Sequence, residues 1–195
     1  MEFTEEERKI ILGTMTDMFN ENRDIFDACK NGDIDFINNY KGDLNITDGL
    51  ITPILVETVY ANQLDVVKLL ISRGVDINEL GNSPDCALHI AIEKNYDDIA
   101  RYLISKSADV NCICEDEWTP LYLSLYKKNY DLFDYMVRFN DIDINAENGR
   151  YSLLYFAMKR DDFDVIKYLL DIDCKKINVI GEPFSKEAKE LMISY

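Results

Sequence analysis

The sequence has little of several features that catalysis, nucleic-acid binding and membrane insertion depend on. Its 195 residues include one histidine, and 21 lysines and arginines stand against 37 aspartates and glutamates, a formal net charge of −16. Such a charge repels phosphate backbones, so it disfavours a nucleic-acid partner and suits solubility or a basic partner surface. No stretch approaches the roughly 18 consecutive apolar residues of a membrane span, so no membrane association is predicted.

The single histidine restricts the enzyme classes open to the chain. A Ser/His/Asp or Cys/His arrangement would have to use His89, because histidine is the usual acid–base group of such sites near neutral pH. Neither a G-x-G-x-x-G motif nor a P-loop occurs, so phosphate binding has no motif. A paired-carboxylate site stays open, although many of the acids recur in a register that suits helix starts. The sequence therefore predicts a protein that is not an enzyme and has no cofactor.

The cysteines indicate a reducing compartment. There are five of them, an odd and scattered set, and the C-x-C spacing of Cys112 and Cys114 is not that of a zinc finger. Reduced thiols that act as small apolar side chains are the simpler interpretation, so no metal site is predicted. The N-terminal MEFTEEERK is acidic where a signal peptide is basic. A cytoplasmic protein is expected.

A motif that recurs at an almost constant interval is the main signal in the chain. An aspartate–apolar–asparagine theme ends four segments, and a degenerate fifth copy follows. The asparagines of the five copies are Asn45, Asn78, Asn111, Asn145 and Asn178. A fixed period of this length indicates a repeat architecture in which each unit buries its apolar face against its neighbours.

Each repeat is predicted to contain two helices. About eight residues before each asparagine lies an apolar run with helical spacing, such as Val66–Leu70, and a second helical segment precedes it, such as Leu88–Ile92. The expected turn residues between the two helices are Gly32, Asn62, Asn95, Asn129 and Asp161. The aspartates expected to favour the dipole of the second helix are Asp35, Asp65, Asp97, Asp131 and Asp164. The unit is thus helix, tight turn, helix and an extended finger.

This unit resembles the ankyrin repeat. The third copy reads Cys86-Ala87-Leu88-His89-Ile90-Ala91 and ends Ala108-Asp109-Val110-Asn111, and Thr-Pro pairs open two other copies, at Thr52-Pro53 and Thr119-Pro120. The resemblance implies an all-α ankyrin-repeat solenoid of about five repeats, with β-hairpin-like fingers and helical caps. It also implies that His89 braces a loop through hydrogen bonds. The second and fourth copies depart from the pattern, since each has one extra residue between the Thr-Pro pair and the turn.

The predicted boundaries follow the repeat and its flanks. Residues 1–23 are expected to form an N-terminal capping helix, which the capping box Thr4-Glu-Glu-Glu7 starts. A last helix is expected within Phe184–Met192, so 181–195 is either a C-terminal cap or a truncated repeat. The ankyrin repeats cover 24–180, divided at about 24–48, 49–82, 83–116, 117–149 and 150–180.

The resemblance also implies where a partner binds, because ankyrin arrays usually use the concave side made of finger tips and inner helices. The residues before the Thr-Pro position are Ile51, Asp85, Trp118 and Tyr151. The variable positions of the inner helices are Lys30, Tyr60, Glu93, Lys94, Tyr126, Lys127, Lys159 and Arg160. Trp and Tyr are typical interface anchors. The alternative is packing between fingers for Ile51 and Tyr151, and ordinary solvated surface for the charged positions; for Leu80 and Ile113 we favour packing.

The function expected from this resemblance is a monomeric protein-interaction module whose partner is another protein. A structural scaffold or spacer array is the alternative. The composition, rich in Ile, Asn, Asp and Tyr, is similar to that of divergent ankyrin repeats in poxviruses and AT-rich protists. A poxvirus origin would imply a host-range or immune-evasion factor in the host cytoplasm, with a host signalling protein as partner. The chain could also be the substrate-recognition part of a longer ubiquitin-ligase adaptor.

Overall fold

A computed structural model describes residues 24–48, 52–80, 85–113, 118–140, 152–172 and 184–195. The chain divides into two compact units, Met1–Ala108 and Asp109–Tyr195, and each is described by itself. The predicted capping helix at 1–23 lies outside the described residues. Every helix in the described part of the chain is too short or too polar to cross a lipid bilayer.

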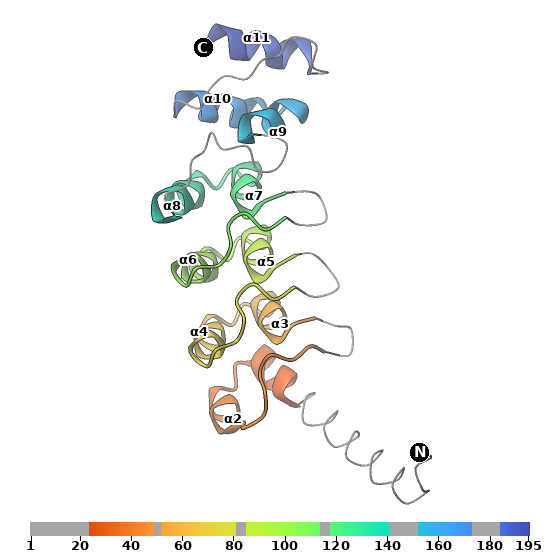
Figure 1. Cartoon of the computed structure of the whole chain (residues 1–195), viewed down its shortest axis with the longest axis vertical. Helices are drawn as coiled ribbons and strands as arrows, with labels where there is room; N and C mark the ends of the chain where they lie inside the picture. The colour runs from red at the N-terminus through yellow and green to blue at the C-terminus, as the bar shows by residue number, and fades with distance from the viewer. Residues whose placement is uncertain (1–23, 49–51, 81–84, 114–117, 141–151, 173–183) are drawn as a thin grey trace, which may run out of the picture. The chain divides into compact units, whose positions relative to one another are not determined.

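The first unit consists of helix pairs, as the repeat predicts. Residues 24–31 are helical. The helices that follow are α2 (Ile34–Asn39), α3 (Ile54–Tyr60), α4 (Leu64–Ser72), α5 (Ala87–Glu93) and α6 (Asp97–Ser105). We call the first helix of each pair inner and the second outer. The inner helices α3 and α5 pack side by side, and so do the outer helices α4 and α6 (Figure 1).

The second unit continues the pattern and ends in an additional helix. Its helices are α7 (Pro120–Tyr126), α8 (Tyr130–Asn140), α9 (Leu153–Lys159), α10 (Phe163–Asp171) and α11 (Lys186–Ser194). Helix α7 packs on α8, α9 on α10, and α11 on α10 (Figure 1). Ser185 caps α11 by accepting a hydrogen bond from the Ala188 amide. The predicted last helix is therefore confirmed.

The turns between inner and outer helices have left-handed backbone. Positive φ angles occur where predicted at Gly32, Asn62, Asn95 and Asp161, but in the fourth copy the turn residue is Lys128, with φ 59°, and not Asn129. Asn129 instead accepts a hydrogen bond from the Leu132 amide and starts α8. The prediction favoured asparagine because it tolerates this conformation. The place in the repeat, and not the residue type, decided which residue takes the left-handed turn. Asn62, Asn95, Lys128 and Asp161 follow one another at equal intervals along the chain.

The helix starts also correct the register of the inner helices. Their N-caps are Pro53, Cys86, Thr119 and Ser152, which are again equally spaced along the chain. Thr119 and Ser152 accept hydrogen bonds from the third amide of their helices, as capping residues do. The two Thr-Pro pairs are therefore out of register by one residue, and the counterpart of Asp85 and Trp118 is Thr52, not Ile51. The predicted extra residue in the fourth copy is also absent.

The outer helices start as predicted. The five aspartates expected near their N-termini all lie in the first turn, where a negative charge favours the helix dipole. The apolar positions of the predicted runs are the core of each unit, for example Val67 and Leu70 in α4 and Val165 and Leu169 in α10, which are at most 1% exposed. Each such side chain contributes roughly 1.5–3 kcal/mol by its burial.

The segments on either side of the finger between α2 and α3 are joined by backbone contacts. Thr47 and Pro53 form an antiparallel bridge, and the Asp48 amide donates to the Thr52 carbonyl at 2.9 Å. Across the repeat boundary, Arg73 at the end of α4 donates to the carbonyls of Ile37 and Tyr40. The finger is thus hairpin-like, as expected, and the arginine satisfies carbonyls at the end of α2.

The histidine and the described cysteines are mainly buried. His89 is 2% exposed, and its Nδ1 lies 3.2 Å from the Sγ of Cys86. Cys29 and Cys86 are buried free thiols and Cys112 is half-buried. Burial raises the pKa of Cys29 to about 11, although a hydrogen bond with Thr58 lowers it in part. Cys114 and Cys174 lie outside the described residues.

Candidate functional site

The predicted partner-binding residues of the inner helices occupy two adjacent register positions. Tyr60, Glu93, Tyr126 and Lys159 are the last residues of α3, α5, α7 and α9. The next residue along the chain is the C-cap, which is Ala61, Lys94, Lys127 or Arg160. All the polar and aromatic members of these two sets are exposed. These residues therefore share a repeated, exposed position at the C-terminal end of the inner helices.

In the second unit three of these predicted residues meet. Trp118 lies just before α7, and its ring centroid is 4.5 Å from that of Tyr126. The guanidinium carbon of Arg160 lies 4.4 Å from the Trp118 ring centroid. Tyr126 is 45% exposed, Arg160 is exposed and Trp118 is half-buried. We call these three residues the aromatic–arginine cluster.

Tyr122 lies under this cluster and was not predicted. It is 2% exposed, its ring makes an edge contact with Trp118 at 5.8 Å, and it also contacts Phe156 of α9 at 5.6 Å. Within the described part of the chain its hydroxyl has no hydrogen-bond partner. Burial raises the pKa of Tyr122 to about 12, against the opposing effect of Arg160. A tyrosine at this helix position reads as core in the sequence, so only the structure shows that it supports the cluster.

In the first unit the same positions form a mixed-charge surface. Tyr60 is 45% exposed, and the Lys94 ammonium lies 5.7 Å from its ring centroid. Burial and the negative charges of Asp85, Glu93 and Glu57 raise the pKa of Tyr60. Glu57 in turn forms a 2.9 Å ion pair with Lys30. Acidic and basic groups thus offset one another around Tyr60.

Ile51 and Tyr151 lie outside the described residues. Leu80 and Ile113 are 49% and 57% exposed, so the prediction that they pack between repeats is wrong. Their burial would need a neighbouring side chain to cover the finger, and the described fingers leave both residues open to solvent.

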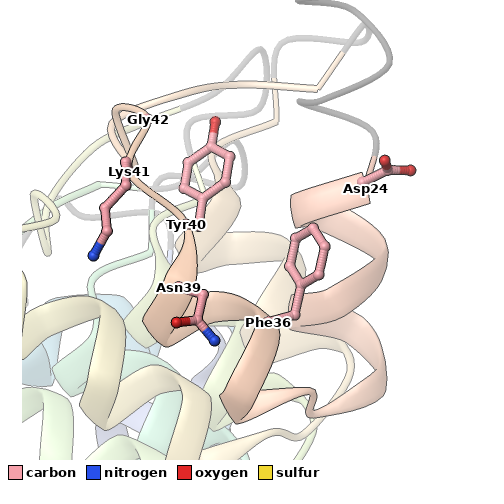
Figure 2. Close-up of a pocket in the computed structure, with 6 residues that line it drawn as sticks. All are labelled: Asp24, Phe36, Asn39, Tyr40, Lys41 and Gly42. Carbon is pink, nitrogen blue, oxygen red and sulfur yellow. The ribbon is translucent and has the colours of Figure 1, made fainter.

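A hollow of about 350 Å³ lies apart from these positions, in the first unit (Figure 2). Figure 2 shows the rings of Phe36 and Tyr40 on either side of it. Asn39, which also lines it, donates its side-chain amide to the Asp35 carbonyl of its own helix. Glu79, a carboxylate whose pKa is raised by burial and by Asp76 and Asp43, does not line it. Figure 2 shows the Asp24 carboxylate and the Lys41 ammonium pointing away from the two rings, so the charged groups of the lining do not converge on the hollow.

The comparisons with known proteins agree with this architecture. The family model for ankyrin repeats, which spans three copies, matches residues 25–114 and 107–179. The chain belongs to the ankyrin-repeat family. Ankyrin repeats are generic protein–protein interaction modules, so the repeats of this chain are protein-binding modules of that general kind. A comparison with curated proteins found no match.

Proposed function

We propose that this ankyrin protein binds a partner protein through the exposed ends of its inner helices, with the aromatic–arginine cluster as one centre of that surface. The observation that supports this most is the convergence of Trp118, Tyr126 and Arg160, which come from the start of α7, its end and the end of α9. Trp, Tyr and Arg are the residue types most enriched at binding hot spots.

The contacts within the cluster also favour binding. A tyrosine or arginine that is free to rotate loses conformational entropy when a partner immobilises it, at roughly 0.5–1.5 kcal/mol per side chain. Here Trp118 already contacts both the Tyr126 ring and the Arg160 guanidinium. A partner would therefore meet a surface whose largest side chains are ordered beforehand.

A scaffold or spacer array is the competing function. Such an array needs only a solvated, charged surface, whereas Tyr60 and Tyr126 each leave 45% of their area exposed on the inner helices. Exposed aromatic groups at repeated positions favour binding over a spacer. A role as a viral host factor or ubiquitin-ligase adaptor, a cytoplasmic location and a monomeric state stay predictions from the sequence.

The proposal is tested with two matched double variants. Tyr126→Ala with Arg160→Gln removes the exposed part of the cluster. Phe163→Ala with Arg138→Gln removes an exposed aromatic residue and an exposed arginine from the outer helices α10 and α8 of the same unit. Each immobilised variant and the wild type are incubated with eukaryotic cell lysate, and the captured proteins are quantified by mass spectrometry.

The expected result is a partner that the wild type and the outer-helix variant retain and the cluster variant loses. Circular dichroism melts of all three proteins establish that each is folded. A partner retained equally by both variants would move the binding site to another surface. If no captured protein distinguishes the wild type from either variant, the spacer function is favoured instead.

A further inference from the structure

The Arg160 side chain has a free hydrogen-bonding edge. A guanidinium group stacks through its flat face and carries its N–H donors in its plane, so an arginine stacked on an indole can still bind a carboxylate through two parallel hydrogen bonds. The guanidinium carbon of Arg160 lies over the Trp118 ring, 4.4 Å from its centroid. It forms no ion pair with any carboxylate in the described ranges. Its exposed N–H donors are therefore open to a ligand.

Charges of both signs lie near Arg160, since Asp161 and Asp162 follow it directly, and Asp162 caps α10 by accepting a hydrogen bond from the Val165 amide. Lys127 follows Tyr126 as the C-cap of α7, and Lys159 precedes Arg160 as the last residue of α9. Both lysines are exposed. The ends of these two inner helices thus carry three cations beside the two rings of the cluster.

The first unit serves as an internal comparison. At the same register positions Lys94 lies over the Tyr60 ring, and Glu93 and Asp85 act on that ring with negative charge. A cation at a helix C-terminus is also favoured by the helix dipole, which could explain Lys94, Lys127 and Arg160 alike. In the second unit Asp162 likewise acts on Tyr122 with negative charge, but it caps α10 through the Val165 amide and forms no ion pair with Arg160 within the described residues.

We propose that the aromatic–arginine cluster binds an acidic segment of the partner protein. A carboxylate of that segment pairs with the Arg160 guanidinium, Lys127 adds attraction at longer range, and an apolar side chain next to the carboxylate packs on the exposed part of Tyr126. This inference rests on the proposed function, since it names the partner chemistry of the same surface.

A nucleic acid is the other anion that arginine and aromatic rings could bind. The net charge of −16 opposes it, because a phosphate backbone would bring many charges into the repulsive field of the chain. A short acidic segment brings few charges, and a directly paired carboxylate is screened less than distant charges. The charge balance therefore favours a protein segment.

The test uses the full chain and a display library of short random peptides. Peptides enriched on the wild type and not on the Tyr126→Ala variant are sequenced, synthesised and titrated against the chain, with Trp118 fluorescence as the readout. Trp118 is the only tryptophan in the sequence, so the signal reports the cluster itself. A matched peptide with each Asp and Glu replaced by Asn and Gln, and a single-stranded oligonucleotide, are titrated beside it.

The expected peptides carry Asp or Glu next to an apolar residue. Their affinity should fall roughly tenfold or more in Arg160→Gln, as for the loss of one partner of a paired charge. The amide-substituted peptide should lose a similar amount. Arg160→Lys should keep the salt dependence of binding but recover only part of the affinity, because lysine lacks the planar donors. Arg138→Gln, an exposed arginine on α8, should bind like the wild type.

Other outcomes separate the inference from the proposed function. Peptides that depend on Tyr126 but show no acidic preference, or bind Arg160→Gln as well as wild type, overturn the acidic partner and leave the binding surface in place. An oligonucleotide that binds more tightly than the acidic peptides also overturns the inference. A selection that enriches no Tyr126-dependent peptide argues against the cluster as a binding surface and so against both proposals.

Discussion

The Tyr168 hydroxyl of α10 donates a 2.6 Å hydrogen bond to the carboxylate of Asp134 on α8. The Tyr122 hydroxyl of α7 is buried and has no hydrogen-bond partner among the described residues. These two tyrosines of the second unit thus differ in how their hydroxyl groups are satisfied. The difference makes them a matched pair for measuring what a phenol hydroxyl contributes to this fold.

Phenylalanine substitutions at these two sites should differ in their effect on the free energy of unfolding. Tyr168→Phe should lower the free energy of unfolding by roughly 1–2 kcal/mol, because it removes a hydrogen bond to a charged group. Tyr122→Phe should leave it unchanged or raise it by up to about 1 kcal/mol, because it removes a buried group without a partner. Urea unfolding followed by circular dichroism measures both. Equal losses in the two variants would mean that the Tyr122 hydroxyl is satisfied in solution.

The same residues predict alkaline destabilisation. Burial raises the pKa of Tyr122 from 10 to about 12, and burial and the hydrogen bond to Asp134 raise the pKa of Tyr168. Between pH 10 and 12 the unfolded chain loses these protons while the folded chain keeps them. Stability should therefore fall as the pH rises through this window, by roughly 2–3 kcal/mol for Tyr122 alone.

The alkaline contribution of Tyr122 can be isolated by comparing variants. The loss of stability between pH 10 and 12, measured by urea unfolding at several pH values, should be smaller in Tyr122→Phe than in the wild type. An identical pH dependence in the two proteins would show that Tyr122 has an ordinary pKa. The pH dependence would then have to come from other groups.

The position of the Arg160 guanidinium over the Trp118 ring predicts a specific response to ionic quenchers. A cation at 4.4 Å from the indole attracts iodide and repels caesium. The ratio of the iodide to the caesium quenching constants should fall by roughly twofold or more in Arg160→Gln at constant ionic strength. Arg138→Gln should leave the ratio unchanged. A ratio that stays constant in Arg160→Gln would mean that the guanidinium does not lie beside the ring in solution.

The left-handed turns predict that glycine gives a higher free energy of unfolding than the native residue at some positions. Asn95 has φ 59°, and Lys94, the residue before it, has φ −82°. Asn95→Gly should raise the free energy of unfolding by roughly 0.5–1 kcal/mol, and Lys94→Gly should lower it by a similar amount. Thermal or urea unfolding measures both. A loss of stability in Asn95→Gly would show that the asparagine side chain contributes more than the backbone strain costs.

The sequence by itself determined the fold class, the two helices of each repeat and the aspartates of the outer helices. The constant repeat period and the helical spacing of apolar residues are local signals, and a repeat protein consists of local units, so little else was needed. The sequence also placed Trp118, Tyr126 and Arg160 on the candidate surface, because their register positions follow from the repeat.

Only the tertiary structure decided the exact register and the composition of the cluster. The turn at Lys128 and the one-residue shift of Thr52-Pro53 depend on where each helix begins. The place in the repeat fixes that start, even when a neighbouring residue has a higher propensity for the turn or the cap. The contact of Arg160 with the Trp118 ring joins residues of neighbouring repeats. Tyr122 reads as core in the sequence, and its support of Trp118 depends on side-chain directions. Such contacts depend on how the side chains of neighbouring repeats pack. The periodic pattern of the sequence does not specify that packing.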